Sequence, residues 1–213
     1  MPSLKPLLLF VGKFFGAYIL LIILTLSLNL NDSHANLFAG IYGGVFENFF
    51  DEAQIQTTGI KPAAGVDDVQ FMIYNTETIK KARSEAKAKG QRNVTIDGLS
   101  WSFNAQRTVL MPLLFLLALI IAYPADWKRK LIGTAIALLV FYLYYLFFMA
   151  GALKLKMHQD KLFFPQYQLS DFSAGFFNNW LYSAVETGFM VMFFVWVVTM
   201  IRVEDFKKLL KTA

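Results

Sequence analysis

The stretch NNWLYSAVETGFMVMFFVWVVTMIR, residues 178–202, is apolar over most of its length and has no basic residue before Arg202. A helix crosses the roughly 30 Å hydrocarbon core of a bilayer with about 20 residues, so this stretch predicts a membrane-spanning helix. One carboxylate, Glu186, interrupts the apolar run. An ionisable residue inside a membrane span is a candidate functional residue by default. The free-energy cost of placing a charge in lipid predicts that its side chain faces the helix bundle.

Three further apolar blocks have the same character, and they begin after Lys13, at Val109 and at Leu131. The chain has 213 residues, of which 56% are hydrophobic and only 16% charged. Four such blocks separated by charged segments predict an α-helical integral membrane protein with four transmembrane helices. Pro112 falls in the first turn of the second block, where its missing N–H costs little and favours a helix start.

The blocks divide the chain into three parts: an N-terminal transmembrane helix at 1–30, an extracytoplasmic cap at 31–107, and a three-helix membrane domain at 108–213. The cap is expected to be a small α+β insertion between helices 1 and 2. Alternation predicts a strand at 67–75, a charged helix runs over 76–90 and ends at Gly90, and Asp97-Gly98 predicts a hairpin turn.

Apolar residues at helical spacing predict an amphipathic helix at 36–50, directly after the first span. Such a helix either lies in the membrane interface or packs on the core of the cap. The sequence alone leaves both arrangements open.

Basic residues in short loops predict the orientation, since Lys and Arg near helix ends resist translocation. Lys5, the turn at 128–130 and the tail from Arg202 carry most of this charge. Both termini are therefore expected in the cytoplasm, the cap outside, and the chain in the inner membrane. A cleaved signal peptide ending near 33–35 is the alternative, but the first apolar run exceeds the usual h-region of about 7 to 15 residues.

Composition also argues against several functions. The net charge of +5 is explained by the cytoplasmic ends, so nucleic acid is not an expected partner. His34 and His158 have no second ligand at metal-binding spacing, so no metal or cofactor is expected. Without cysteine and without a G-x-S-x-G turn, the sequence gives no nucleophile for an enzyme.

The candidate site is a polar stripe on the last helix, since positions three, four and seven apart share a face. Its members are Asn179, Ser183, Glu186 and Thr187. Possible partners for the carboxylate are Arg107, Tyr142 and Tyr145. The stripe can serve as interhelical glue, as a contact to another membrane protein, or as part of a proton relay, and the sequence does not decide among them.

Three stretches carry a resemblance to a known group: RTVLMPLLFLLALIIAYPADWKRKLIG at 107–133, the aromatic helix after it, and the closing span. Together they resemble the small multipass proteins that accompany bacterial exosortases, enzymes that process the C-terminal tail of exported proteins at the outer face of the inner membrane. The resemblance implies an accessory role with an exosortase as partner. It transfers no catalytic residue, and the cysteine expected of the enzyme itself is missing here.

The expected function is therefore a noncatalytic accessory or scaffold subunit of an envelope protein-sorting complex, in contact with membrane lipid and another integral membrane protein. A small transporter or ion-conducting component that uses Glu186 is one alternative. An intramembrane hydrolase is another, and it would need a second acid such as Asp160 or Asp171.

Overall fold

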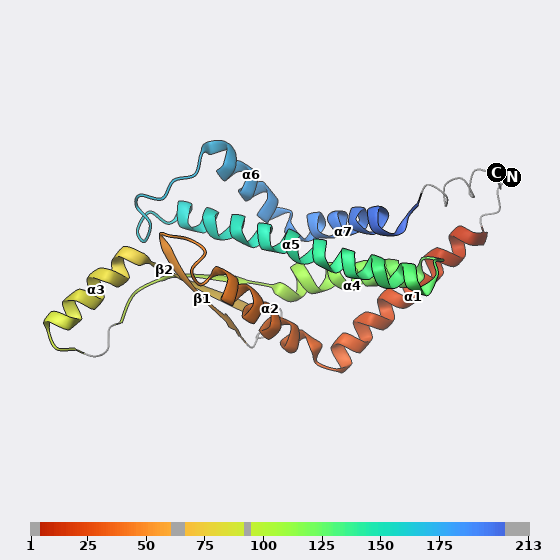
Figure 1. Cartoon of the computed structure of the whole chain (residues 1–213), viewed down its shortest axis with the longest axis horizontal. Coiled ribbons are helices and arrows are strands. Elements are labelled where there is room, and N and C mark those ends of the chain that lie inside the picture. Colours follow the sequence, from red (N-terminus) through yellow and green to blue (C-terminus); the bar gives the residue numbers. More distant parts are fainter. Residues whose placement is uncertain (1–4, 61–66, 92–94, 203–213) are drawn as a thin grey trace. The chain divides into compact units, whose positions relative to one another are not determined.

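The computed structural model describes residues 5–60, 67–91 and 95–202 (Figure 1). Its elements in chain order are α1 (Lys5–Ser27), α2 (Leu30–Phe46), β1 (Ala53–Gly59), β2 (Val69–Asn75), α3 (Thr76–Ala88), β3 (Leu99–Phe103), the π-helical turn η1 (Gln106–Leu110), α4 (Met111–Ala122), α5 (Trp127–Gln159), α6 (Asp171–Tyr182) and α7 (Ala184–Met200).

The chain forms two compact units, which are described one at a time. The helical unit comprises Met1–Asn31, Arg107–Tyr145 and Ser183–Ala213, and the cap unit comprises Asp32–Gln106 and Leu146–Tyr182. The predicted cap at 31–107 thus shares its compact unit with residues 146–182, which the sequence had placed in the membrane domain. Helix α5 contributes residues to both units.

Two helices of the described chain, α1 and α5, are long and apolar enough to cross a membrane, and α6 with α7 adds a third candidate if the pair is one span. The segment Gln106–Ala122, which contains α4, is apolar but shorter. The prediction of a helical membrane protein therefore holds at this coarser level, with two or three candidate spans. The side chains of α1 are largely exposed, as lipid-facing residues would be.

In the helical unit, α4 packs against both α1 and α7. Phe115 of α4 is central to this packing: its ring meets Phe14 of α1 edge-on at 5.4 Å between centroids and Phe189 of α7 at 5.2 Å. Edge-to-face aromatic pairs of this kind add about 0.5 to 1.5 kcal/mol each beyond the burial of their area. The α1, α4 and α7 contacts are thus aromatic and apolar.

Pro112 creates a defect in this apolar unit, because it has no N–H to donate to the carbonyl of Thr108 four residues earlier. Tyr145 of α5 corrects the defect, since its buried hydroxyl donates a hydrogen bond to that carbonyl. Gly188 of α7 makes the space, because a Cβ there would lie 2.9 Å from the Tyr145 hydroxyl and 3.2 Å from Pro112 Cγ. We call these four residues the proline node, and it joins α4, α5 and α7.

The start of α5 makes hydrogen bonds at three helix ends, through Asp126 just before the helix and Arg129 and Lys130 in its first turn. Asp126 Oδ1 accepts from the Arg129 N–H at 2.8 Å, which caps the start of α5. The Arg129 guanidinium donates to the Met200 carbonyl at the end of α7, and Lys130 Nζ donates to the Ile121 carbonyl of α4 at 2.6 Å. Cations at helix C-termini also oppose the negative end of the helix dipole. The basic turn therefore has a structural role in addition to its predicted effect on orientation.

The cap unit contains a three-stranded antiparallel sheet in the order β1-β2-β3. One face is buried and apolar, with Ile55, Val69, Phe71, Ile73 and Phe103 as its residues. Helix α2 covers this face: Phe38 stacks on Phe103 at 5.8 Å, and a Cβ at Gly59 of β1 would clash with Asn36 Oδ1. The opposite face carries polar residues such as Gln70, which donates to Ser100 Oγ at 2.8 Å.

Asp68, just before β2, holds the start of the helix that follows β3. Its carboxylate is 4% exposed and accepts hydrogen bonds from the N–H groups of Ala105 at 2.6 Å and Gln106 at 2.9 Å. Burial raises the pKa of this carboxyl group, and the two backbone donors oppose that rise. Asp68 therefore acts as an N-cap supplied from a distant part of the chain.

Several local predictions can now be compared with the fold. The strand expected at 67–75 is β2, and the helix expected at 76–90 is α3, with Gly90 at φ +65° after its end. The helix expected at 36–50 is α2, which begins earlier. The predicted hairpin around Asp97-Gly98 is wrong, because residues 95–98 form no strand and β3 pairs with β2 instead. The first strand of that predicted hairpin also included residues 93–94, which lie outside the described residues. Strand β1 was not foreseen.

We expect Tyr145→Phe to destabilise the protein by about 1 kcal/mol, because it leaves the Thr108 carbonyl without its donor in an apolar surrounding. Gly188→Ala should also destabilise, because its Cβ would meet the tyrosine hydroxyl. The double variant should cost less than the sum of the two, since Phe removes the oxygen that Ala would meet. Thermal denaturation in detergent measures all three, with Tyr182→Phe, which is 86% exposed, as the control. Full additivity would contradict the proline node.

Removal of the Asp68 carboxylate by Asp68→Ala should destabilise the protein by about 1 to 2 kcal/mol, because two helix-start N–H groups lose their acceptor. The raised pKa also predicts a pH effect. The group's contribution is fully present below its unfolded-state pKa and is lost as the pH rises through its higher folded-state pKa. The stability difference between wild type and Asp68→Asn, measured from pH 3 upward, should therefore shrink with rising pH; a widening difference would contradict this.

Candidate functional site

The predicted polar stripe does not form on one continuous helix. The segment breaks at Ser183, between α6 and α7. Asn179 lies on α6, whereas Glu186 and Thr187 lie in the first turn of α7. The Ser183 and Thr187 hydroxyls lie 3.1 Å apart, and the Thr187 N–H also donates to the Ser183 carbonyl at 2.8 Å. The helical spacing behind the predicted stripe therefore does not run through Ser183, and the interaction role proposed for these four residues stays a prediction.

Glu186 has an exposed side chain and makes no ion pair within the described residues. Of its three predicted partners, Tyr145 donates to Thr108 instead, Tyr142 packs edge-on against Phe141 at 5.3 Å, and Arg107 is exposed in η1. The position of Glu186 has a simple physical reason. A carboxylate in the first turn of a helix stabilises the positive end of the helix dipole.

The two histidines have structural surroundings. His158 Nδ1 accepts a hydrogen bond from the Leu169 N–H at 3.0 Å. His34 lies on α2 near Phe38, and burial lowers its pKa to about 4. Over residues 5–60, 67–91 and 95–202, no group of three His, Cys, Asp or Glu side chains is placed to hold a metal ion.

The candidate site is a solvent-open cavity of about 490 Å³ in the cap unit. It lies between the turn before β1, the start of α3 and the loop that follows α5. Its lining residues are Asp51, Glu52, Asn75, Thr76, Glu77, Lys80, Phe164, Pro165, Gln166, Tyr167 and Gln168. Cavities of roughly 300 to 1,000 Å³ are the size at which proteins bind small molecules or single side chains of a partner.

Asn75 joins two walls of this cap cavity. Its side-chain oxygen caps α3 by accepting from the N–H groups of Glu77 at 2.9 Å and Thr78 at 3.3 Å. Its side-chain nitrogen donates to the Phe163 carbonyl at 2.9 Å. The amide oxygen and the amide nitrogen of this half-buried side chain both make hydrogen bonds, and together they fix the loop after α5 against the start of α3.

The loop after α5, residues 160–170, is held by its own contacts as well. Asp160 Oδ1 accepts from the N–H groups of Leu162 and Phe163, at 3.1 and 3.2 Å. Lys161 Nζ donates to the Tyr167 carbonyl at 3.1 Å, and Phe164 is buried. Together with the bond to His158, these contacts preform the loop wall, so little ordering is required when a ligand enters.

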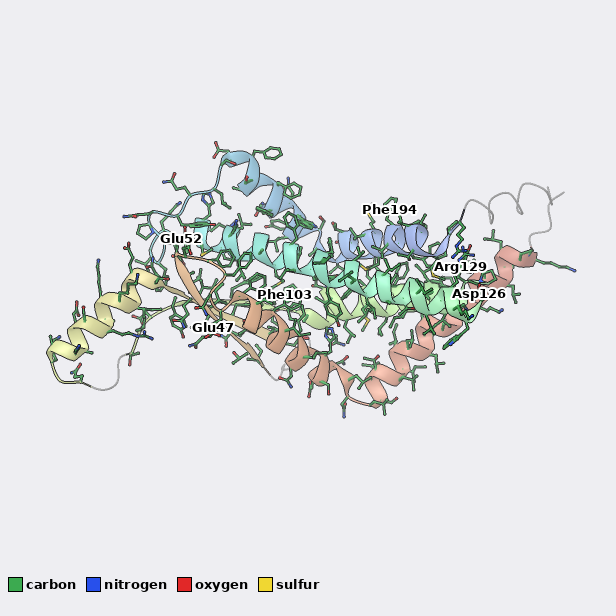
Figure 2. The ribbon with its side chains drawn as sticks, viewed as in Figure 1. Glu47, Glu52, Phe103, Asp126, Arg129 and Phe194 are labelled. Carbon is green, nitrogen blue, oxygen red and sulfur yellow. The ribbon has the colours of Figure 1, made fainter. Side chains whose placement is uncertain are left out.

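The charge of the cap cavity is negative, since its lining has three carboxylates, Asp51, Glu52 and Glu77, against one cation, Lys80. Tyr167 is half-buried; burial, and then the negative charge of Glu52, raises the pKa of its hydroxyl. The hydroxyl therefore stays protonated and able to donate. Figure 2 labels Glu52 at this part of the cap unit.

Chemically, this arrangement suits binding rather than catalysis. Carboxylates, amides and a tyrosine beside a buried phenylalanine recognise a cationic or hydrogen-bonding group that projects from a larger partner. The sequence did not predict this cavity, because its walls are Asn75 and a loop 88 positions later. The only local signal was an Asn directly before a charged helix, which is an N-cap pattern.

Comparison with known protein families, with characterised proteins and with solved structures finds no match to this chain. The arguments for function therefore rest on the site itself.

Proposed function

We propose that this protein is a noncatalytic accessory or scaffold subunit of a bacterial envelope membrane complex, and that its cap cavity receives part of a partner protein. The observation that carries the proposal is the cap cavity: a preformed, negatively charged recess held open by Asn75 and by the loop at 160–170. The sequence resemblance gives the finer proposal, an exosortase-type sorting complex of the inner membrane.

Chain geometry supports four membrane crossings. Asn75 of the cap donates to Phe163 of the loop after α5, so both lie on the same side of the membrane. The chain between them must then cross an even number of times. Helix α5 is one crossing, and the apolar segment Gln106–Ala122 is the available second one.

The length of α5 supports the same arrangement. Its 33 residues extend about 50 Å at 1.5 Å per residue, against a hydrocarbon core of roughly 30 Å. The excess carries the C-terminal end of the helix, where Phe148 approaches Phe103 at 6.3 Å, into the cap unit. With α1 and α7 as the first and last spans, both termini lie on the same side of the membrane, and the basic residues of the short loops and ends favour the cytoplasm for that side.

The alternatives receive less support from the described residues. A transporter would use Glu186 together with polar groups in the helical unit, but the α1, α4 and α7 contacts are aromatic. A hydrolase would use Asp160 or Asp171 as a second acid. Asp160 instead accepts hydrogen bonds from N–H groups of its own loop, and Asp171 is the first residue of α6.

Affinity purification from native membranes in mild detergent tests the proposal. Wild-type protein should recover a second membrane protein, and Glu52→Lys should reduce that recovery severalfold by reversing a charge at the cap cavity. Glu85→Lys is the matched control, because it makes the same change on the exposed surface of α3 outside the cavity.

A comparison with Glu186→Leu separates the two candidate surfaces. Loss of the partner with Glu52→Lys alone assigns the interface to the cap cavity, as proposed. Loss with Glu186→Leu alone would move the interface to the start of α7 and would contradict the role of the cavity. Recovery of no partner with wild type would contradict the subunit proposal.

A further inference from the structure

Helix α2 is apolar on two faces, and only one of them is covered. The covered face packs on the sheet with Ala35, Phe38, Ala39, Tyr42 and Phe46, which are 0 to 5% exposed. The second face carries Leu37, Ile41 and Val45 at four-residue spacing, and these side chains are 55%, 42% and 43% exposed. We call this second face the outer stripe, and Leu30 at 41% exposure extends it to the start of the helix.

The outer stripe cannot turn inward, because the opposite face of α2 is already fixed on the sheet. Asn36 lies within contact distance of Gly59, and the Ile55 N–H donates to the Glu47 carbonyl at 3.3 Å. No charged residue occurs between Asp32 and Glu47. The outer stripe is therefore an apolar surface that the described protein leaves open.

Chain connectivity places the start of α2 at a membrane boundary. Only Leu28 and Asn29 separate α1 from α2, and two residues reach at most about 7 Å. Asn29 adopts a left-handed conformation with φ 50°, so α1 and α2 are not one continuous helix. Since α1 is a candidate span, α2 begins within about one helical turn of the point where that span leaves the bilayer.

Apolar exposure is also continuous across this turn. Leu24 and Leu26 at the end of α1, then Leu28 and then Leu30, are 41 to 63% exposed. Helix α2 cannot itself be a span, because its sheet-bound face belongs to a folded unit with a polar outer face. A short helix with one buried face and one open apolar face beside a span has the composition of an interfacial helix.

We propose that the outer stripe of α2 lies in the lipid of the outer leaflet, with the helix parallel to the membrane surface. Fatty acyl chains are the ligand class, and Leu37, Ile41 and Val45 are the inserted residues. The polar arc with Ser33 and Gly40, and Glu47 directly after the helix, then face water. His34, at the edge of the outer stripe, is neutral at pH 7 because burial lowers its pKa to about 4, so it adds no charge to the lipid-facing side.

The absence of cysteine from the sequence makes a direct test possible. Full-length Ile41→Cys carries a nitroxide label in phosphatidylcholine vesicles, and its collision rates with oxygen, which enters lipid, and with a water-soluble nickel chelate are measured. Gly40→Cys is the matched control: it is one residue away but on the polar arc, and a Cβ there meets nothing within 4 Å. Val45→Cys and Glu47→Cys form a second pair.

The expected result is oxygen accessibility severalfold above nickel accessibility at positions 41 and 45, with the reverse at 40 and 47. Nickel accessibility at all four positions would show the outer stripe in water and overturn the proposal. Low accessibility to both reagents with slow label motion at 41 and 45 would show a protein cover, either a partner or a second copy, and would overturn it equally. Unchanged elution of each variant on size exclusion verifies the fold.

Discussion

The structure depends on one constraint: inside apolar surroundings, each backbone polar group needs a partner from the protein itself. Pro112 breaks this rule locally, because it starts α4 well but leaves the Thr108 carbonyl without its helical donor. Tyr145 provides that donor, and Gly188 keeps α7 close enough to enclose it. The hydrogen bond that replaces the missing N–H group therefore holds α4, α5 and α7 together.

The opposite ends of the same helices follow the same constraint. Carbonyl groups that close α4 and α7 have no partners within their helices. Lys130 and Arg129, in the first turn of α5, donate to them (Figure 2 labels Arg129 and Asp126 here). A basic turn that orients a membrane protein can thus also cap its helices, so the two roles need not compete.

In the cap unit the constraint is met by side chains from distant parts of the chain. Asp68 supplies the acceptor for the helix after β3, and Asn75 both caps α3 and fixes the loop after α5. Asn75 thereby fixes one wall of the cap cavity. In the proposed topology the same hydrogen bond requires the cap and that loop to lie on one side of the membrane.

Sequence reasoning succeeded where the information is local. The apolar blocks predicted α1 and α5, and the alternation of apolar and polar residues predicted β2. The charged sequence from Thr76 to Gly90 predicted α3. It missed β1, whose AQIQTTG sequence contains the β-branched Ile55, Thr57 and Thr58 but only one large apolar residue. It paired β3 wrongly, because Asp97-Gly98 is a good turn but the apolar face of β2 is the better partner.

The candidate site was less predictable, for a physical reason. A break at Ser183 leaves the apolar pattern of residues 178–202 unchanged, and no Pro or Gly marks it. Spacing rules therefore treat Asn179 and Glu186 as residues of one helix, whereas they lie on α6 and α7. The cap cavity depends on a contact between Asn75 and Phe163, which no local pattern encodes. A contact between residues this far apart in the chain can be predicted only once the fold is known.

Membrane topology is the most direct test of the account, because every role proposed for the cap requires it outside. Single cysteines at Gln91, Lys128, Gln166 and Arg202 are reacted with a membrane-impermeant maleimide in intact cells whose outer barrier is opened. The account predicts labelling at 91 and 166 and protection at 128 and 202 until the inner membrane is permeabilised. Labelling of 91 with protection of 166, or labelling of 128, would contradict it.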